Sequence, residues 1–96
     1  MFIKIHKNTN AEVIAVCDEN LIGKVIEDKN MKVVVSERFY KGEMKSNSEI
    51  IEILREAKNI NLIGKETIDL AIKNGLINNK NIIKIKNIPH AQIFSI

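Results

Sequence analysis

The sequence predicts one α+β domain over residues 1–96, in which a mostly antiparallel or mixed sheet packs against two helices. Three observations support this prediction. Apolar segments typical of strands come first, two amphipathic helical patterns occupy the middle, and a short pair of strands closes the chain. This order differs from the regular strand–helix alternation of a parallel α/β protein. Ninety-six residues provide one modest hydrophobic core.

Two strands are expected at the start of the chain. Residues 2–6 alternate between the two sides of a strand, which predicts one solvated face. Residues 12–17 are apolar on both sides, which is typical of a central strand. The turn residues 8–10 between them favour a hairpin.

The next part of the chain has weaker patterns. Residues 18–20 end the second strand, and Gly23 either adopts a positive φ or lets another segment approach closely. Residues 27–30 predict a polar turn, residues 32–36 a strand, and Gly42 the start of an exposed loop.

Two helices are predicted in the middle, near residues 49–58 and 66–74. Ser46 and Glu49 match a capping box, which places the first helix directly after them. Gly75, followed by Leu76, has the pattern of a Schellman stop at the end of the second helix.

Three short strands are expected around and after the second helix. Residues 61–63 predict a buried strand, and residues 81–86 a strand that places Lys84 and Lys86 on one face. Residues 87–90, which include the only proline, are expected to turn the chain into a last strand over residues 91–96.

Composition limits the classes of function. The formal charge of +3 and the pI near 9.1 permit a polyanionic partner, but a dedicated duplex-DNA binder usually has a larger cationic excess. One cysteine fits a reducing cytoplasm. No apolar run reaches the ~20 residues that span a bilayer. We therefore expect a cytoplasmic protein without a membrane or DNA partner and without a cofactor.

The pentapeptide at residues 20–24 recurs as residues 61–65. In a chain this rich in Ile, Asn and Lys, coincidence is the better explanation. The second copy is not a Walker A loop, because Asn59 and Glu66 replace the first glycine and the Ser/Thr. Lys65 either binds an anion at a helix N-terminus or is a solvated turn residue.

Cys17 has two interpretations. It is either a small buried residue at a strand end or a nucleophile paired with His90. No metal site is predicted, because Cys17, His6, His90 and Asp18 lack ligand spacing.

Two further segments have both a structural and a binding interpretation. His90 is either a turn histidine bound to a carbonyl or a group that binds and titrates. Arg38, Tyr40 and Lys41 either contact an RNA strand, or Phe39 fills the core and Tyr40 covers a sheet edge.

Several short motifs, taken together in this order, resemble a small archaeal family of unknown function. They are Val16-Cys17-Asp18 with Leu21-Ile22-Gly23-Lys24, Phe39-Tyr40-x-Gly42, Asn61-Leu62-Ile63-Gly64 and Ile88-Pro89-His90-Ala91-Gln92. The resemblance implies an archaeal cytoplasmic protein and favours an association with RNA or translation components. It implies a site formed by Cys17, Asp18, Gly23, Lys24, Tyr40, Asn61, Gly64, Pro89, His90 and Gln92.

The expected function is that of a non-catalytic protein that binds RNA or a ribosome-associated partner. Tyr40 would stack on a base, and His90 and Gln92 would form hydrogen bonds. The phosphates would be neutralised by Lys24, Lys65, Lys84 and Lys86. Two alternatives are a small enzyme centred on Cys17 and His90, and a protein-interaction subunit. The sequence leaves the oligomeric state open.

Overall fold

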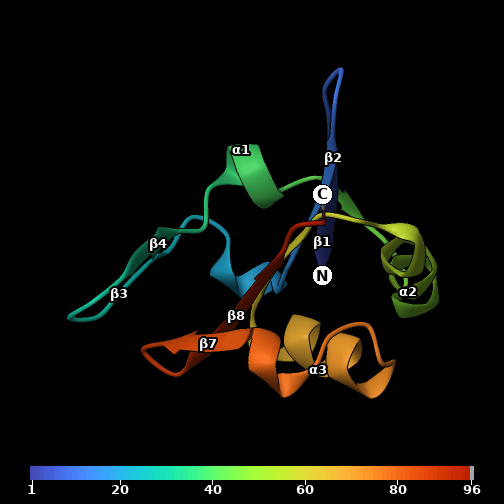
Figure 1. Cartoon of the computed structure of the whole chain (residues 1–96). Helices are drawn as coiled ribbons and strands as arrows, with labels where there is room; N and C mark the ends of the chain where they lie inside the picture. Colours follow the sequence, from blue (N-terminus) through green and yellow to red (C-terminus); the bar gives the residue numbers. More distant parts are fainter. Residues whose placement is uncertain (96) are drawn as a thin grey trace.

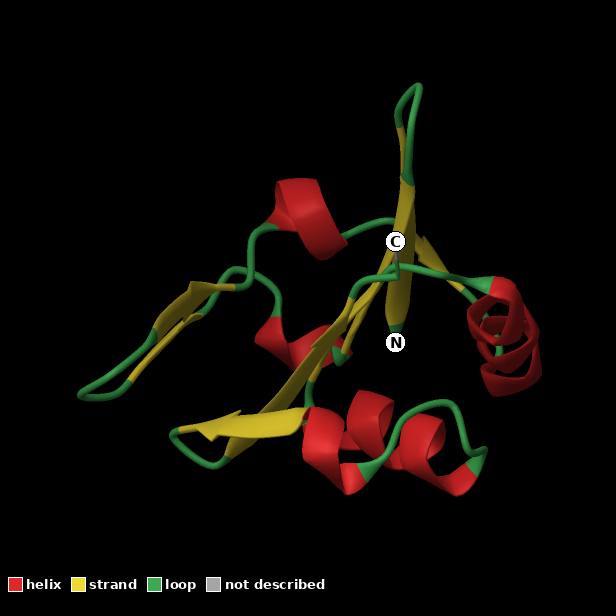
Figure 2. Cartoon of the chain, viewed as in Figure 1, coloured by secondary structure: helices red, strands yellow, loops and turns green. Residues whose placement is uncertain are grey.

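The computed structural model describes residues 1–95, which contain eight strands and three α-helices (Figures 1 and 2). The strands are β1 (Phe2–Lys7), β2 (Glu12–Cys17), β3 (Val25–Glu27), β4 (Lys32–Val34), β5 (Glu43–Met44), β6 (Ile60–Ile63), β7 (Ile82–Ile85) and β8 (Ile88–Ile93). The helices are α1 (Glu37–Tyr40), α2 (Asn47–Glu56) and α3 (Lys65–Lys73), with short 3₁₀ turns η1 (Glu19–Leu21) and η2 (Asn79–Asn81).

Six strands form one mixed sheet in the order β5-β1-β2-β6-β8-β7. At its centre β2 and β6 pair in parallel, and within residues 1–95 the other strand pairs are antiparallel. The parallel pair therefore joins an N-terminal antiparallel group to a C-terminal one. Strands β3 and β4 form a separate hairpin. The predicted α+β fold with a mixed sheet is confirmed.

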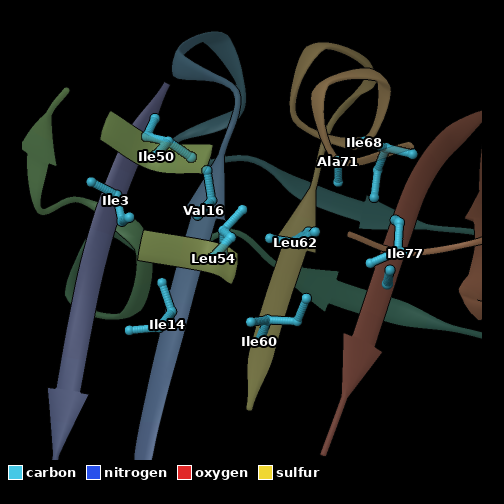
Figure 3. Packing of buried hydrophobic residues seen from close by; sticks show 11 residues of the cluster. Ile3, Ile14, Val16, Ile50, Leu54, Ile60, Leu62, Ile68, Ala71 and Ile77 are labelled. Atoms are coloured by element: carbon cyan, nitrogen blue, oxygen red, sulfur yellow. The ribbon is translucent and has the colours of Figure 1, made fainter. Parts of the chain in front are cut away.

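The sheet buries both of its faces, but unequally. Helices α2 and α3 cover the first face with Ile50, Leu54, Ile68 and Ala71, which pack on aliphatic side chains of β1, β2 and β6 (Figure 3). The second face holds a smaller cluster that includes Cys17, Tyr40, Ile63 and Ile85. This second face is the one on which the polar side chains of β6 and β8 gather.

Local sequence signals correctly predicted the central strand, the start of α2 and the stop after α3. Strand β2 has the expected bounds, and the Ser46–Glu49 capping box is present at the start of α2. At the end of α3, Gly75 has φ 67°, and the N–H of Leu76 donates to the carbonyl of Ala71 (2.9 Å). This hydrogen bond is the one that defines a Schellman motif.

Several short elements were not predicted. Strands β3 and β5 and helix α1 have two to four residues each, too few for a periodic pattern to emerge. Helix α2 ends at Glu56, earlier than expected, and α3 begins one residue early, at Lys65.

The turn predicted at residues 87–90 was also wrong. The turn between β7 and β8 is made by Lys86 (φ 52°) and Asn87 (φ 67°), so Lys86 does not share a strand face with Lys84. Strand β8 begins at Ile88 and ends at Ile93, and Ile96, the predicted end of that strand, lies outside the described residues.

Pro89 is tolerated within β8 although strands flank it on both sides. Its carbonyl accepts a hydrogen bond from the N–H of Gly64 (3.0 Å), so a donor at residue 89 would also point toward Gly64. The carbonyl of Gly64 already accepts from Ile68 N–H in the first turn of α3 (2.9 Å). The missing N–H of proline therefore leaves no acceptor without a partner, and the usual rule against proline in a paired strand does not apply.

No helix within residues 1–95 is long and apolar enough to cross a membrane.

Candidate functional site

The topology brings the ends of three strands to one edge of the sheet. Because β6 is parallel to β2, and β7 is antiparallel to β8, strands β2, β6 and β7 all end at the same edge. Asp18, the Gly64-Lys65 step and Lys86 follow these strands directly. Asp18 and Gly64, which are far apart in the sequence and belong to separate motifs, are thereby in contact.

Asp18 has a structural role at this edge. Its carboxylate accepts hydrogen bonds from Glu66 N–H (3.1 Å), from Thr67 N–H (2.8 Å) and from the Thr67 hydroxyl (2.8 Å). Asp18 is buried, and it caps the N-terminus of α3 from a distant part of the chain. The capping residue within the chain, Gly64, has no side chain that could do so.

The Asp18 cap argues against an anion site at the Gly64-Lys65 step. The free N–H groups that would attract an anion at the start of α3 are bound to a carboxylate that the protein itself supplies. Lys65 is exposed and lines an open groove of about 630 Å³ with Asp18, Glu19, Glu66 and Ile88. Because carboxylates line this groove with Lys65, it does not have the chemistry of a phosphate site.

Cys17 and His90 do not form a catalytic pair. Cys17 pairs with Ile63 and Ile63 with His90, so β6 lies between the two side chains. Burial, followed by the nearby Asp18 charge, raises the pKa of the fully buried Cys17 thiol to about 12. A thiol with this pKa is protonated at neutral pH and is a poor nucleophile. Within residues 1–95, no group of three or more His, Cys, Asp and Glu side chains could hold a metal ion.

Tyr40 does not lie on the surface, where it was expected to stack on a base. Its ring is buried in the second-face cluster, and its hydroxyl donates to Asn61 Oδ1 (2.5 Å). Burial, with a smaller effect from Cys17, raises the pKa of Tyr40 to about 12. The alternative interpretation assigned the core position to Phe39 and the sheet edge to Tyr40, but Tyr40 is the buried residue and Phe39 is half-buried. A polar row, formed by Tyr40, Asn61, Gln92 and His90, crosses the second face of the sheet, and Tyr40 and Asn61 are its buried end.

His90 and Gln92 continue this polar row on β8. His90 Nδ1 lies 2.9 Å from the Leu62 carbonyl, and His90 Nε2 lies 3.2 Å from Gln92 Nε2. A carbonyl only accepts, so Nδ1 is the protonated nitrogen and Nε2 accepts from the Gln92 amide. Burial lowers the pKa of His90, although its bond to Leu62 acts in the opposite direction, and the neutral ring is consistent with both contacts.

Positive charge is concentrated in two hairpins, residues 24–34 and 80–93, which we call the basic hairpin pair. They carry two carboxylates, Glu27 and Asp28, and six exposed lysines: Lys24, Lys29, Lys32, Lys80, Lys84 and Lys86. The pair has a formal charge of +4, while the whole chain has +3. The remaining residues therefore sum to −1, and the basic character of the protein belongs to these two segments.

The two hairpins are neighbours in space and project from the same side of the molecule (Figure 1). Asp28 sits in the β3–β4 turn, where its carboxylate accepts from the N–H groups of Asn30 and Met31 (both 2.9 Å). These bonds, with a smaller effect from Lys86 of the other hairpin, hold the pKa of Asp28 below its ordinary value. Met31 also lines a small cavity with Asn81, Ile83, His90 and Gln92.

Of the four lysines predicted to meet phosphate, three lie in the basic hairpin pair and Lys65 lies outside it. The other three lysines of the pair, Lys29, Lys32 and Lys80, were not among the predicted residues. Charge counted by segment, rather than over the whole chain, would have pointed to the three C-terminal lysines, since none of the 12 Asp and Glu residues lies in positions 70–96.

These features define a small α+β protein with a mixed six-stranded sheet, a distant aspartate cap and a basic pair of hairpins. The chain belongs to the family described as protein of unknown function (DUF424), whose model matches residues 6–96. The predicted membership of a small family of unknown function is confirmed.

A solved structure supports the same fold. The chain is similar to an uncharacterized conserved protein from the archaeon Methanopyrus kandleri, with a TM-score of 0.78 and 27% sequence identity. The similarity covers 96% of this chain and 88% of the other. The comparison with curated protein sequences found no match.

Proposed function

We propose that this protein is a non-catalytic RNA-binding protein and that the basic hairpin pair is its contact surface. The observation that carries the proposal is the concentration of a +4 charge in two adjoining hairpins of a chain whose other residues sum to −1. Lysines neutralise phosphates and release condensed counterions, so clustered lysines supply affinity even when the net charge is small. Lys84 and Lys86 lie on the same hairpin as His90 and Gln92.

The environments of Cys17 and His90 favour a binding role over the enzyme alternative that was centred on them. The thiol of Cys17 is buried and protonated, and both ring nitrogens of His90 contact protein groups. The hydrogen bond between Tyr40 and Asn61, at the buried end of the polar row, is a structural contact. The residues that sequence reasoning considered for catalysis thus all have structural partners.

The test is a binding titration with single-stranded and hairpin RNAs at several salt concentrations. The double variant Lys84→Glu with Lys86→Glu should abolish binding at moderate salt, and the wild type should lose affinity steeply as salt rises. Each lost phosphate contact should reduce the salt slope by about 0.7. A matched control, Lys7→Glu with Lys58→Glu, makes the same change in net charge far from the basic hairpin pair and should retain binding.

A protein partner is the second candidate, and one observation favours it. Val25 and Val34 face each other on the outer side of the β3–β4 hairpin and are 55% and 53% exposed. An isolated two-stranded hairpin with an exposed apolar pair is typical of an interaction surface. If the wild type binds no RNA at low salt, the RNA proposal fails and a partner from the translation machinery becomes the leading hypothesis.

A further inference from the structure

The cavity between the two hairpins has the chemistry of a site for a flat, polar ring. Its lining, which we call the slot, consists of Met31 from the β3–β4 turn, Asn81 and Ile83 from the start of the second hairpin, and His90 and Gln92 from β8. We propose that the slot takes one unstacked nucleobase of a single-stranded RNA. This inference rests on the proposed function and specifies which part of the RNA is recognised.

The polar wall of the slot is oriented before any ligand arrives. The Leu62 carbonyl fixes the tautomer of His90, and His90 Nε2 in turn accepts one N–H of the Gln92 amide. One hydrogen of that amide is thereby used, so its second N–H and its carbonyl oxygen remain to pair with another group. A donor beside an acceptor is the pattern that matches the edge of a nucleobase.

Gln92 has the exposure that such a role needs, whereas His90 does not. The Gln92 side chain is exposed, while His90 is only 3% exposed. His90 is therefore a positioning residue, and Gln92 is the residue that would touch the base. This arrangement assigns separate roles to two residues that the sequence analysis treated alike.

The apolar wall consists of one side chain from each hairpin. Met31 is 42% and Ile83 is 44% exposed, and both line the cavity beside the buried His90. A base between them would cover apolar surface that now faces water. The cavity of about 210 Å³ lies below the ~300–1,000 Å³ typical of drug-sized ligands, which favours a single ring system.

The surroundings of the slot fit a nucleotide strand rather than a free neutral ring. Lys80 precedes Asn81, and Lys29 lies two residues before Met31. Both lysines are exposed, so phosphates beside the seated base would meet cations. The charge thus supplies affinity, and the slot supplies the contact with the base.

Gln92 is the only glutamine in the chain, which makes the test direct. The protein is labelled with ¹⁵N at the glutamine side-chain amide, and it is titrated with a single-stranded RNA of about eight nucleotides and with an abasic strand of equal length. We expect the side-chain amide signals of Gln92 to shift with RNA and to stay in place with the abasic strand. The affinity for RNA should exceed that for the abasic strand by at least about fivefold, as expected from the contribution of one base contact.

Two variants and one control complete the test. Gln92→Leu and Met31→Ala change exposed side chains, so the fold should survive, and each should lower the affinity for RNA toward that for the abasic strand without changing the salt slope. Asn79→Ala, a neighbouring exposed amide outside the slot, should leave both affinities unchanged.

The outcomes separate this inference from the proposed function. Equal binding of RNA and abasic strand, with an unmoved Gln92 signal, overturns the slot and leaves RNA binding by the basic hairpin pair intact. No binding of either strand at low salt overturns both.

Discussion

The carboxylate of Asp18 occupies the space in which a side chain on residue 64 would begin. A β-carbon built on Gly64 would overlap the carboxylate carbon and both oxygens of Asp18. Gly64 also has φ 115° and ψ 154°, a conformation that is almost restricted to glycine. The glycine and the aspartate therefore depend on each other, since the cap of α3 reaches its N–H groups only because residue 64 has no side chain.

Gly64→Ala should consequently be much more destabilising than an alanine at another glycine with positive φ. We expect a loss of at least about 3 kcal/mol, from backbone strain together with displacement of the buried cap. Gly75→Ala is the matched control, because φ is 67° there and no atom lies within 4 Å of the added carbon. That control should lose about 1 kcal/mol. Urea unfolding of both variants measures the difference, and equal losses would contradict this role for the Asp18 carboxylate.

Ser46→Ala should lower the stability by ~1 kcal/mol, the usual value for a lost N-cap. The Ser46 hydroxyl accepts from Glu49 N–H (3.3 Å), and the Glu49 carboxylate accepts from Ser46 N–H (3.2 Å). Ser48→Ala, whose side chain contacts only that of Ser46 (3.3 Å), should change stability by less. Thermal or urea unfolding checks this, and equal effects would mean that α2 begins later.

Cys17 should react slowly with thiol reagents in the folded protein. Its pKa of about 12 leaves almost no thiolate at neutral pH, and its side chain is fully buried. Since it is the only cysteine, the reaction rate reports on this site alone. The rate should rise by orders of magnitude in denaturing urea. Rapid modification without urea would contradict the buried position of Cys17.

Tyr40 should ionise well above its ordinary pKa of 10, near pH 12. The chain has one tyrosine and no tryptophan, so an ultraviolet titration follows this phenol without interference. Because the folded pKa is raised, the folded state binds more protons between pH 10 and 12, and its stability should fall as pH rises through that window. A midpoint near pH 10 in the folded protein would show that the ring is exposed.

His90 should make stability fall as the pH drops below about 6.5. Burial lowers the folded pKa of His90 below 6.5, so the unfolded chain takes up this proton first. The stabilising contribution is complete above pH 6.5 and is lost as pH falls through the depressed folded pKa. Between about pH 8 and pH 5, the free energy of unfolding should therefore change less with pH in His90→Gln than in the wild type. His6→Gln, which removes the other histidine, is the control, and it should retain the pH dependence of stability that His90 causes.

The sequence predicted those features whose signals are local. The capping box at Ser46, the stop at Gly75 and the apolar run at residues 12–17 each act within a few residues, and each was found where expected. Pro89 is the opposite case. It was taken for a turn residue because its tolerance in β8 depends on Gly64 and Ile68, which precede it by 25 and 21 residues.

The candidate site was only partly predictable for the same reason. The motif residues Asp18 and Gly64 were identified, but their contact depends on the parallel pairing of β2 with β6, which no periodic pattern encodes. Tyr40 was misjudged because an aromatic residue between Arg38 and Lys41 has the same sequence pattern whether it binds RNA or fills a core. The slot was not foreseen because it joins Met31 to β8 across the chain.

The parallel pairing also has a kinetic consequence. Ile14 pairs with Ile60, so the chain must close a loop of more than forty residues before β2 and β6 can meet. The neighbouring antiparallel pairs, β1–β2 and β6–β8, close shorter loops than this one and can form earlier, but each leaves a central strand with one unpaired edge. Closure of that loop is therefore expected to limit the rate of folding. Before the loop closes, the two half-sheets expose unpaired strand edges to other chains. The protein is therefore expected to be most prone to aggregate during this slow step of folding.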